Sequence, residues 1–289
     1  MKNCRNYTIG KLLEEGIIAL KSVGIESYIL DCRLLLGKVI DKDNLFIMLN
    51  RDFLVEEKQA KEYFKFIEIR KEKMPIKYIL GKCEFMGLDF EVKQGVLIPR
   101  PDTEILVEEA ISIIKEKNYK NVCDVCCGSG IIGISIGKFV NNTKIDCFDI
   151  SDIAVETTGV NLKLHNLNDR VNVFKSDLLN YAIDNQKKYD IIVSNPPYIR
   201  EEVIPTLMED VKKYEPFEAL SGGKDGLYFY KKILEQSKKV LNKDGRVIFE
   251  IGHDQKEDVT KLLLENGFKN IISLKDLAGW DRVVGAMYK

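Results

Sequence analysis

The sequence predicts an α/β protein in which a mostly parallel sheet follows a small bundle of helices. Helical periodicity alone fills about the first eighty residues, whereas from residue 121 short β-rich runs alternate with helical stretches. That alternation is typical of parallel strands whose connecting helices cover both faces of a sheet. The last two strand-like runs, 271–274 and 282–287, are joined by a loop too short for a helical crossover. We therefore expect this final pair to be antiparallel.

Length and charge narrow the class of protein. The chain has 289 residues, 45% hydrophobic and 31% charged, as in an ordinary soluble globular enzyme. Its formal net charge is −1, which argues against holding nucleic acid by bulk charge. No apolar run reaches the roughly 18–20 residues that span a bilayer, and residues 1–10 lack the apolar core of a signal peptide. We expect a cytoplasmic monomer without a membrane or direct nucleic-acid partner.

The cysteines raise the question of a metal site. The seven are Cys4, Cys32, Cys83, Cys123, Cys126, Cys127 and Cys147. Their odd number, in a long chain without an export signal, does not fit a disulfide framework. Three of them are close in sequence, but a tetrahedral site needs four ligands, and His165 and His253 form no second cluster with them. We expect small buried thiols in a strand and its following turn, and no metal.

The N-terminal region, residues 1–82, is expected to be a small helical domain. Thr8 can cap its first helix and Gly24 can end it. Apolar residues at helical spacing predict four helices, at residues 9–23, from Ser27 onward, at 45–49 and at 55–73. This region carries no chemistry of its own, and partner docking, a lid and simple structural support remain open as its role.

Residues 83–98 are expected to link this region to the α/β domain of residues 99–289. Two short apolar runs around Gly87 predict a hairpin. The Pro99-Arg100-Pro101 segment then breaks regular structure, and a helix opens in which Pro101 and the acidic residues suit the first turn. Five further strands are expected at residues 122–126, 144–150, 171–175, 190–194 and 246–251. Helices are expected at residues 131–139, 153–165, 226–241 and 255–265.

The first strand of the α/β domain runs into a turn of small residues, Cys126-Cys127-Gly128-Ser129-Gly130, and a helix follows. The two glycines allow a tight turn and a close approach by a ligand. A ligand there would meet the free N–H groups of the helix N-terminus. The turn is not a Walker motif, because no Gly-Lys-Ser/Thr follows, and it is not a complete dinucleotide fingerprint.

Acidic residues follow the next two strands. Asp149 ends the second strand, where a carboxylate commonly accepts hydrogen bonds from both ribose hydroxyls. Asp177 ends the third, in the right place for a polar contact to adenine. Each acid could instead cap the helix that follows it. The position of Asp149 relative to the glycine turn favours ligand binding, whereas both interpretations stay open for Asp177.

The motif that points to a reaction is Asn195-Pro196-Pro197-Tyr198, directly after an apolar strand. Two prolines remove backbone donors and restrict φ, which makes the loop rigid. The loop presents two acceptors, the side-chain oxygen of Asn195 and a backbone carbonyl. This pair matches a planar –NH2 group with its two donors, and Tyr198 supplies a flat face beside it. The alternative is a plain loop punctuated by prolines.

Such a loop suits methyl transfer from a sulfonium to an amide or an aromatic amine. The nitrogen lone pair is delocalised and a poor nucleophile. Acceptors on both N–H bonds orient it and stabilise the positive charge that grows on nitrogen, so they favour the transition state over the ground state. Near-attack alignment can contribute roughly 7–11 kcal/mol more. No strong base is needed, because methylation itself acidifies the N–H.

With these motifs in view, the chain resembles the HemK-type glutamine N5-methyltransferases, which modify peptide chain release factors. The resemblance runs over nearly the whole chain. It includes Tyr78-Ile79-Leu80-Gly81, Glu84-Phe85-Met86-Gly87-Leu88, Pro99-Arg100-Pro101-Asp102-Thr103-Glu104, Asn195-Pro196-Pro197-Tyr198, Glu215-Pro216, Glu250-Ile251-Gly252 and Lys275-Asp276-Leu277-Ala278-Gly279. The Asn-Pro-Pro-Tyr element alone is shared with adenine N6-methyltransferases.

The resemblance implies a Rossmann-like methyltransferase fold that uses S-adenosylmethionine as methyl donor and releases S-adenosylhomocysteine. The acceptor it implies is the glutamine of the Gly-Gly-Gln motif in peptide chain release factors, in support of translation termination. It implies donor contacts from Cys126, Cys127, Gly128, Ser129, Gly130, Asp149, Asp177, Leu178 and Asn195. It implies glutamine contacts from Asn195, Pro196, Pro197 and Tyr198, with Arg100 and Glu104 lining the cleft.

One position departs from the family pattern. Family members usually have glycine where this chain has Cys126, and a cysteine disfavours positive φ. We expect the turn to survive, because Gly128 and Gly130 remain. The property that this substitution bears on is the affinity for the donor.

Three alternatives stay open on the sequence. A nucleic-acid amine methyltransferase would use the same acceptor pair, but the net charge of −1 and the lack of a basic aromatic recognition module argue against it. A catalytically silent adaptor could bind a partner through the helical domain. A nicotinamide-dependent dehydrogenase would use the glycine turn differently. The balanced charge favours a protein side chain as the acceptor.

Overall fold

The computed structural model describes residues 7–289, and contacts within it divide the chain into two compact units. One unit comprises Met1–Lys82 and Glu209–Tyr214, and the other comprises Cys83–Met208 and Glu215–Lys289. Cys4 lies outside the described residues, and the six other cysteines are free thiols. A linker of residues 83–98 and a domain of residues 99–289 stay predictions.

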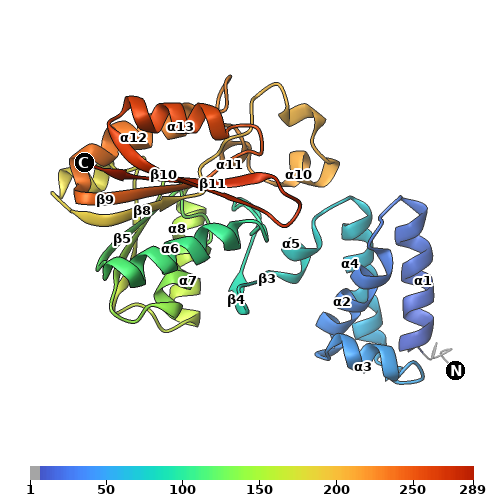
Figure 1. The fold of residues 1–289 in the computed structure, drawn as a ribbon. Coiled ribbons are helices and arrows are strands. Elements are labelled where there is room, and N and C mark those ends of the chain that lie inside the picture. The colour runs from blue at the N-terminus through green and yellow to red at the C-terminus, as the bar shows by residue number, and fades with distance from the viewer. Residues whose placement is uncertain (1–6) are drawn as a thin grey trace, which may run out of the picture. The chain divides into compact units, whose positions relative to one another are not determined.

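The first unit is a set of helices around an apolar core (Figure 1). Leu12, Leu35 and Tyr63 are among its fully buried side chains. Its elements are β1 (Tyr7–Thr8), α1 (Ile9–Ser22), α2 (Tyr28–Ile40), α3 (Asn44–Leu49), β2 (Leu54–Val55), α4 (Glu57–Lys71), α5 (Ile76–Leu80) and α10 (Glu209–Tyr214).

The helix ends in this unit test the expected caps. Thr8 caps α1 as predicted, because its hydroxyl accepts from the N–H of Lys11 at 3.3 Å. Ser27 precedes α2 but makes no side-chain capping bond. The expected start of the fourth helix at Val55 was wrong, since Val55 pairs with Tyr7 in a short strand. That helix begins at Glu57, after a capping box between Glu56 and Gln59.

The second unit contains a hairpin and a seven-stranded sheet. The hairpin joins β3 (Lys82–Phe85) to β4 (Leu88–Glu91), and its two turn residues, Met86 and Gly87, both have positive φ. The strands of the sheet are β5 (Asn121–Val125), β6 (Lys144–Asp149), β7 (Val171–Lys175), β8 (Tyr189–Ser194), β9 (Leu241–Glu250), β10 (Phe268–Lys275) and β11 (Asp281–Tyr288).

The strand order in the sheet is β10-β11-β9-β8-β5-β6-β7. The pairs from β9 to β7 are parallel, and β11 runs antiparallel to both of its neighbours. The prediction of a mostly parallel sheet with an antiparallel last strand is therefore confirmed. Its cause is visible in the connections, since a short loop between β10 and β11 cannot carry a crossover helix.

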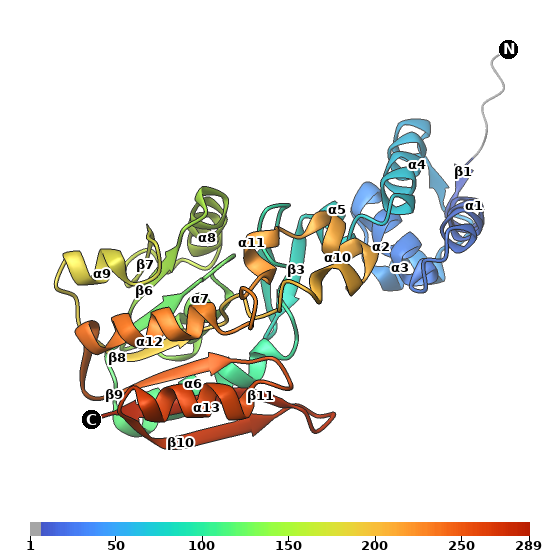
Figure 2. The ribbon, with the colours of Figure 1, turned by 90° about the horizontal axis from the view of Figure 1, so that it is seen from above.

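Helices cover both faces of this sheet (Figures 1 and 2). On one face lie α6 (Thr103–Lys117), α7 (Ile131–Phe139) and α8 (Asp152–Leu164). On the other lie α9 (Asn180–Asp184), α12 (Tyr228–Val240) and α13 (Lys256–Glu265). Alternate residues of each strand feed the two cores, as Ile191 and Ile192 do in β8. Such two-sided burial explains the unbroken apolar run Ile191-Ile192-Val193 in the central strand β8.

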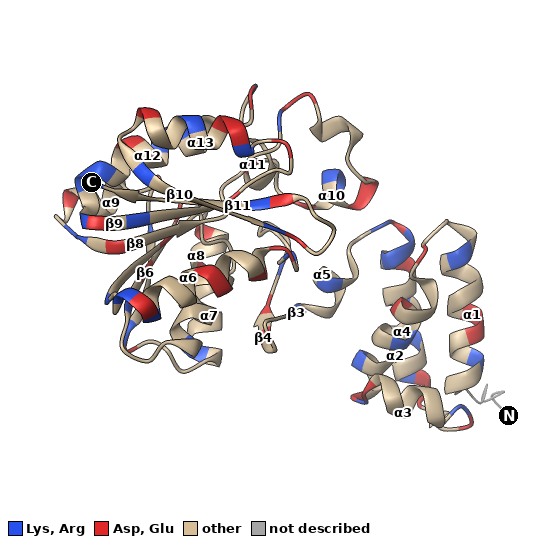
Figure 3. Ribbon diagram, viewed as in Figure 1, with Lys and Arg blue, Asp and Glu red and all other residues tan. Residues whose placement is uncertain are grey.

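Short elements account for the differences from the expected fold. The 3-10 turn η1 (Ile204–Thr206) and the helices α5, α9, α10 and α11 (Phe217–Leu220) were not predicted. Pro101 lies before α6 rather than in its first turn, since Asp102 occupies the N-cap. Positive and negative residues are interspersed on the helices of both units (Figure 3). Among the described residues, no helix has the length and apolarity that crossing a membrane requires.

A buried ion pair stabilises the helical unit. The Nε atom of Arg70 lies 2.8 Å from Oδ2 of Asp31, and these side chains are only 9% and 2% exposed. Arg70 also donates to the carbonyl oxygen of Met74 at 3.0 Å. Because both charges are removed from water, the loss of either partner would leave the other uncompensated.

We expect Asp31→Ala to lower the free energy of unfolding by about 3 kcal/mol, because it strands a buried guanidinium. Chemical denaturation of the full chain measures this change. The control is Glu57→Ala, which removes one partner of an exposed i,i+4 pair with Lys61 and should barely shift the midpoint. Equal effects of the two substitutions would contradict the account.

Candidate active site

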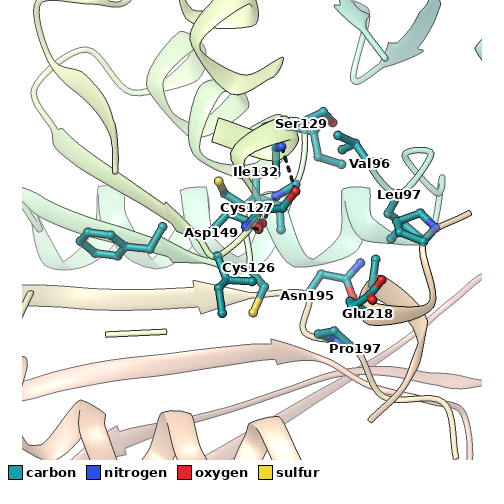
Figure 4. A pocket seen from close by; sticks show the side chains of 18 of the residues that line it. Val96, Leu97, Cys126, Cys127, Ser129, Ile132, Asp149, Asn195, Pro197 and Glu218 are labelled. Atoms are coloured by element: carbon teal, nitrogen blue, oxygen red, sulfur yellow. Dashed lines mark hydrogen bonds between the residues drawn. The ribbon is translucent and has the colours of Figure 1, made fainter. Parts of the chain in front are cut away.

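A cavity of about 440 Å³ opens beyond the carboxyl ends of the parallel strands. It is large enough for a small-molecule ligand. Side chains from the turn after β5, from the end of β6 and from the loop after β8 line it together (Figure 4). Of the residues expected at the site, the cavity is lined by Arg100, Cys126, Cys127, Gly128, Ser129, Asp149, Asp177, Leu178, Asn195 and Pro197.

The turn after β5 folds back with three residues in the left-handed region. The φ angles are +61° at Cys126, +57° at Gly128 and +81° at Gly130. The N–H of Cys127 donates to the carbonyl oxygen of Phe148 at 3.1 Å, which ties the turn to the neighbouring strand. The expectation that the turn survives a cysteine at this position agrees with this geometry. Gly130 packs against Thr158 and is not among the lining residues.

Asp149 is held directly beside this turn (Figure 4). Its Oδ2 atom accepts from the N–H of Gly128 at 2.9 Å, and its Oδ1 atom accepts from the N–H of Ser151 at 2.9 Å. The N-cap of α8 is Ser151, whose hydroxyl accepts from Ala154, so Asp149 does not cap that helix. Burial raises the pKa of Asp149, and its hydrogen bonds oppose the rise.

Asp177 is exposed at the edge of the same cavity. The N-cap of the next helix, α9, is Leu179, and that cap has no side-chain hydrogen bond. Leu178 adopts a positive φ of 50°, and its carbonyl oxygen accepts from the hydroxyl of Ser176 at 2.7 Å. This local bond turns the chain so that Asp177 and Leu178 both reach the cavity.

A second carboxyl lies underneath the turn and was missed by the sequence analysis. Asp124 in β5 is fully buried, and its Oδ2 atom accepts from the N–H of Gly133 in α7 at 2.9 Å. Burial raises its pKa to about 7. Its Oδ1 atom has no hydrogen-bond partner within the described part of the chain. The signal for it was an acid inside an otherwise apolar strand.

The Asn195-Pro196-Pro197-Tyr198 segment leaves the end of β8 at the other side of the cavity. Asn195 and Pro197 line the cavity, whereas Pro196 and Tyr198 are not among the lining residues. The Nδ2 atom of Asn195 donates to the hydroxyl oxygen of Thr103 at 3.3 Å. Tyr198 instead directs its hydroxyl to Oε1 of Glu250 at 3.4 Å.

Arg100 and Glu104 were both expected to line the cleft, but their side chains make different contacts. Arg100 lines the cavity, and its guanidinium lies 2.6 Å from Oε1 of Glu215, a side chain only 1% exposed. Glu104 is not among the lining residues. Its carboxylate accepts from the N–H of Met86 at 2.8 Å and so anchors the β3–β4 hairpin to α6. Its neighbour Thr103 faces the cavity in its place.

Several further residues line the cavity, although the sequence analysis gave them no role at the site. They come from the loop before α6, from the start of α11 and from α12, and they include Gly95, Val96, Leu97, Pro99, Pro216, Glu218, Ala219 and Phe229. These residues make much of the wall apolar. Only the folded course of the loops brings them to the ends of β5 and β8.

The clustered cysteines do not converge on one point. Cys123 belongs to the core on one face of the sheet and Cys127 to the core on the other. Burial raises the pKa of the Cys123 and Cys126 thiols well above the ordinary value, and a hydrogen bond to Cys147 followed by burial does the same for Cys127. Across residues 7–289, no three His, Cys, Asp or Glu side chains gather as metal ligands would.

Comparison with known proteins identifies the family. A release factor glutamine methyltransferase of Clostridium botulinum is 61% identical over 275 residues, which are 95% of this chain and 97% of that protein. The chain belongs to the release factor glutamine methyltransferase family. A member from Clostridium acetobutylicum is 52% identical over 268 residues, 93% of this chain and 94% of that protein. The resemblance inferred from the motifs is thus confirmed.

Domain families and solved structures agree with this assignment. Residues 102–211 match the family described as Methyltransferase small domain, and residues 11–81 match the PrmC N-terminal domain. Among solved structures, the hMettl16 catalytic domain in complex with the MAT2A 3′UTR hairpin 6 aligns with a TM-score of 0.56 and 15% identity. That alignment covers 82% of this chain and 85% of the other. At this identity it shows a shared methyltransferase fold.

The positive φ of Cys126 can be tested by comparing the stabilities of its glycine and alanine variants. At ordinary positions glycine is less stable than alanine by about 0.5–1 kcal/mol. At φ +61° the order should invert, because alanine pays the left-handed strain that glycine avoids. We expect Cys126→Gly to unfold at a higher temperature than Cys126→Ala. The control pair is Lys163→Gly and Lys163→Ala in α8, where the alanine variant should unfold at the higher temperature. If the alanine variant is the more stable at both positions, the φ of Cys126 is not strained.

Proposed function

We propose that this protein transfers a methyl group from S-adenosylmethionine to the side-chain amide nitrogen of the glutamine in the Gly-Gly-Gln motif of peptide chain release factors. The observation that carries the proposal is the meeting of two elements at one cavity. The turn after β5 and the carboxylate of Asp149 lie on one side, and the Asn195 loop lies on the other.

The residues at the first side fit a nucleoside-containing donor. Asp149 is held by two backbone N–H groups and is placed to accept from ribose hydroxyls. We assign Cys126, Cys127, Gly128, Ser129 and Gly130 to the donor-binding turn, and Asp177 and Leu178 to the adenine edge. Gly130 acts there through the shape of the turn. The bound donor supplies an electrophilic methyl group.

The Asn195 loop suits the acceptor amide. The side-chain oxygen of Asn195 and the backbone carbonyl of Pro196 would accept the two N–H bonds of the glutamine amide. This holds the nitrogen lone pair toward the methyl group and stabilises the charge that develops on nitrogen. Pro197 and Tyr198 keep the loop rigid, and Arg100 lines the cavity. We assign Glu104 to the support of the hairpin.

The remaining parts of the proposal concern the partners. We propose that residues 1–82 form a helical domain that contributes to release factor binding, with residues 83–98 as linker and 99–289 as the catalytic domain. We also propose that the protein is a monomer and works in the cytoplasm, where release factors act. Transfer to bare RNA or DNA that falls steeply with salt would favour the nucleic-acid alternative instead.

Donor binding should depend on Asp149. Two hydrogen bonds to a charged acceptor contribute about 1.5–3 kcal/mol each. We expect Asp149→Asn to weaken the binding of S-adenosylmethionine by roughly 100-fold, as measured by calorimetry. The control Asp152→Asn removes an exposed charge three residues away and should bind as the wild type does. Unchanged affinity in Asp149→Asn would contradict the assignment.

Methyl transfer should depend on Asn195. We expect Asn195→Ala to lose at least about 100-fold in kcat with labelled donor and a purified release factor, since it removes one acceptor of the reacting amide. The control is Asn185→Ala, an exposed amide at the end of α9. A release factor with Gln→Ala in its Gly-Gly-Gln motif should accept no label. Equal labelling of both release factors would refute the proposed acceptor.

A further inference from the structure

A buried carboxyl lies directly behind the Asn195 loop. Glu250 ends β9 and is 2% exposed. Strand pairing places it there, because Phe249 lies opposite Ser194 in the parallel β8–β9 ladder. Nothing in the methyl-transfer scheme above uses this carboxyl. A buried acid without a structural ion pair of its own calls for a reason in function.

The contacts of Glu250 lead back to Asn195. Its Oε1 atom accepts from the hydroxyl of Tyr198 at 3.4 Å, and the side chain of Thr103 lies near enough to lower the pKa of the carboxyl, as a hydrogen-bond donor does. Within the described residues Oε2 has no hydrogen-bond partner, so it is available to accept from the Thr103 hydroxyl. Thr103 is itself fully buried, and its Oγ1 atom accepts from Nδ2 of Asn195 at 3.3 Å.

The donors and acceptors available on these groups determine which end of the Asn195 amide faces Thr103. An ionised carboxylate can only accept, so a hydrogen bond between Glu250 and Thr103 uses the single hydroxyl hydrogen of Thr103. The remaining lone pairs of Thr103 can then only accept, and they select the –NH2 end of the Asn195 amide. The carbonyl oxygen of Asn195 is thereby turned away from Thr103 and left free for a substrate N–H.

We infer that Thr103 and Glu250 are positioning residues, which together hold the Asn195 amide in the orientation that accepts the glutamine –NH2 group. The inference rests on the proposed function. Without this pair the amide of Asn195 could rotate by half a turn and present its own –NH2 group to the substrate, where two donors would oppose each other.

The ionisation of Glu250 makes the orientation of the Asn195 amide depend on pH. Burial raises the pKa of Glu250 to about 7, and the charge of Asp102 adds to the rise, while Thr103, Tyr198 and Arg282 oppose it. Tyr230 also faces this residue, with its hydroxyl on the backbone oxygen of Glu250 at 2.8 Å. Below pH 7 the protonated carboxyl can donate, so it no longer forces the direction of the Thr103 hydroxyl.

The raised pKa of Glu250 also makes the stability of the folded chain depend on pH. Because the pKa is raised, the folded chain binds the proton more tightly than the unfolded chain does. The ionised carboxyl therefore costs stability progressively as the pH rises from the ordinary value of 4.5 to about 7. Glu250→Gln, which cannot ionise, should be at least as stable as the wild type above pH 7. If Glu250→Gln is stable but has a low kcat, its loss of activity comes from lost positioning and not from misfolding.

The test compares kcat, KM and donor affinity in full-length variants with a purified release factor. We expect Thr103→Val and Glu250→Gln to lower kcat at least tenfold with KM and donor affinity within threefold of wild type, because the orientation matters in the transition state. Thr103→Ser should restore most of the rate. Glu250→Gln should lack the fall in kcat that the wild type shows below pH 7. Glu235→Gln, an exposed carboxyl of α12, is the control.

Wild-type kcat and an unchanged pH profile in Glu250→Gln, together with wild-type kcat in Thr103→Val, would overturn the inference. A Thr103→Ser variant as slow as Thr103→Val would also overturn it, since the hydroxyl would then not be the active group. If Glu250→Gln does not fold, the two Thr103 variants decide. A wild-type enzyme that labels no release factor glutamine would refute the proposed function instead.

Discussion

The arrangement of the whole site depends on the parallel pairing of β5 with both β6 and β8. β5 runs between β6, which is the next strand along the chain, and β8, which is the third strand after it. At this point the chain direction of the connections reverses, and the loops on either side of β5 diverge. The carboxyl ends of the three strands therefore open on one cavity, and residues 69 positions apart in sequence, such as Val125 and Ser194, lie side by side.

Burial and backbone strain work together at this edge. The turn after β5 places three residues at positive φ, and this brings the N–H of Gly128 to the carboxylate of Asp149. Two other carboxyls, Asp124 and Glu250, lie in the sheet beneath the turn and behind the Asn195 loop, and burial raises the pKa of each to about 7. Features that cost stability are thus concentrated at the site, as expected where positioning matters more than packing.

Much of the fold could be predicted because its patterns are long. The helix expected at residues 131–139 has the bounds of α7, and the apolar strands alternate between two cores. The helices α9 and α11, of five and four residues, are too short to show a periodicity. Glu104 was expected at the cleft from the resemblance to the family, but Thr103 lines the cavity instead, since consecutive residues on a helix point about 100° apart. One faces the cavity and the other the hairpin.

The roles of single acids were harder to predict, because they depend on neighbours that are distant in sequence. Whether Asp149 caps α8 or faces a ligand depends on Ser151, which takes the cap itself. Glu250 reaches the Asn195 loop only through the β8–β9 ladder. The central claim is that this edge presents a glutamine amide to a methyl donor. Fragment mass spectrometry of a release factor treated with enzyme and S-adenosylmethionine tests it most directly. We expect one added methyl group, on the side-chain nitrogen of the Gly-Gly-Gln glutamine; a methyl group on another residue, or none, would contradict the account.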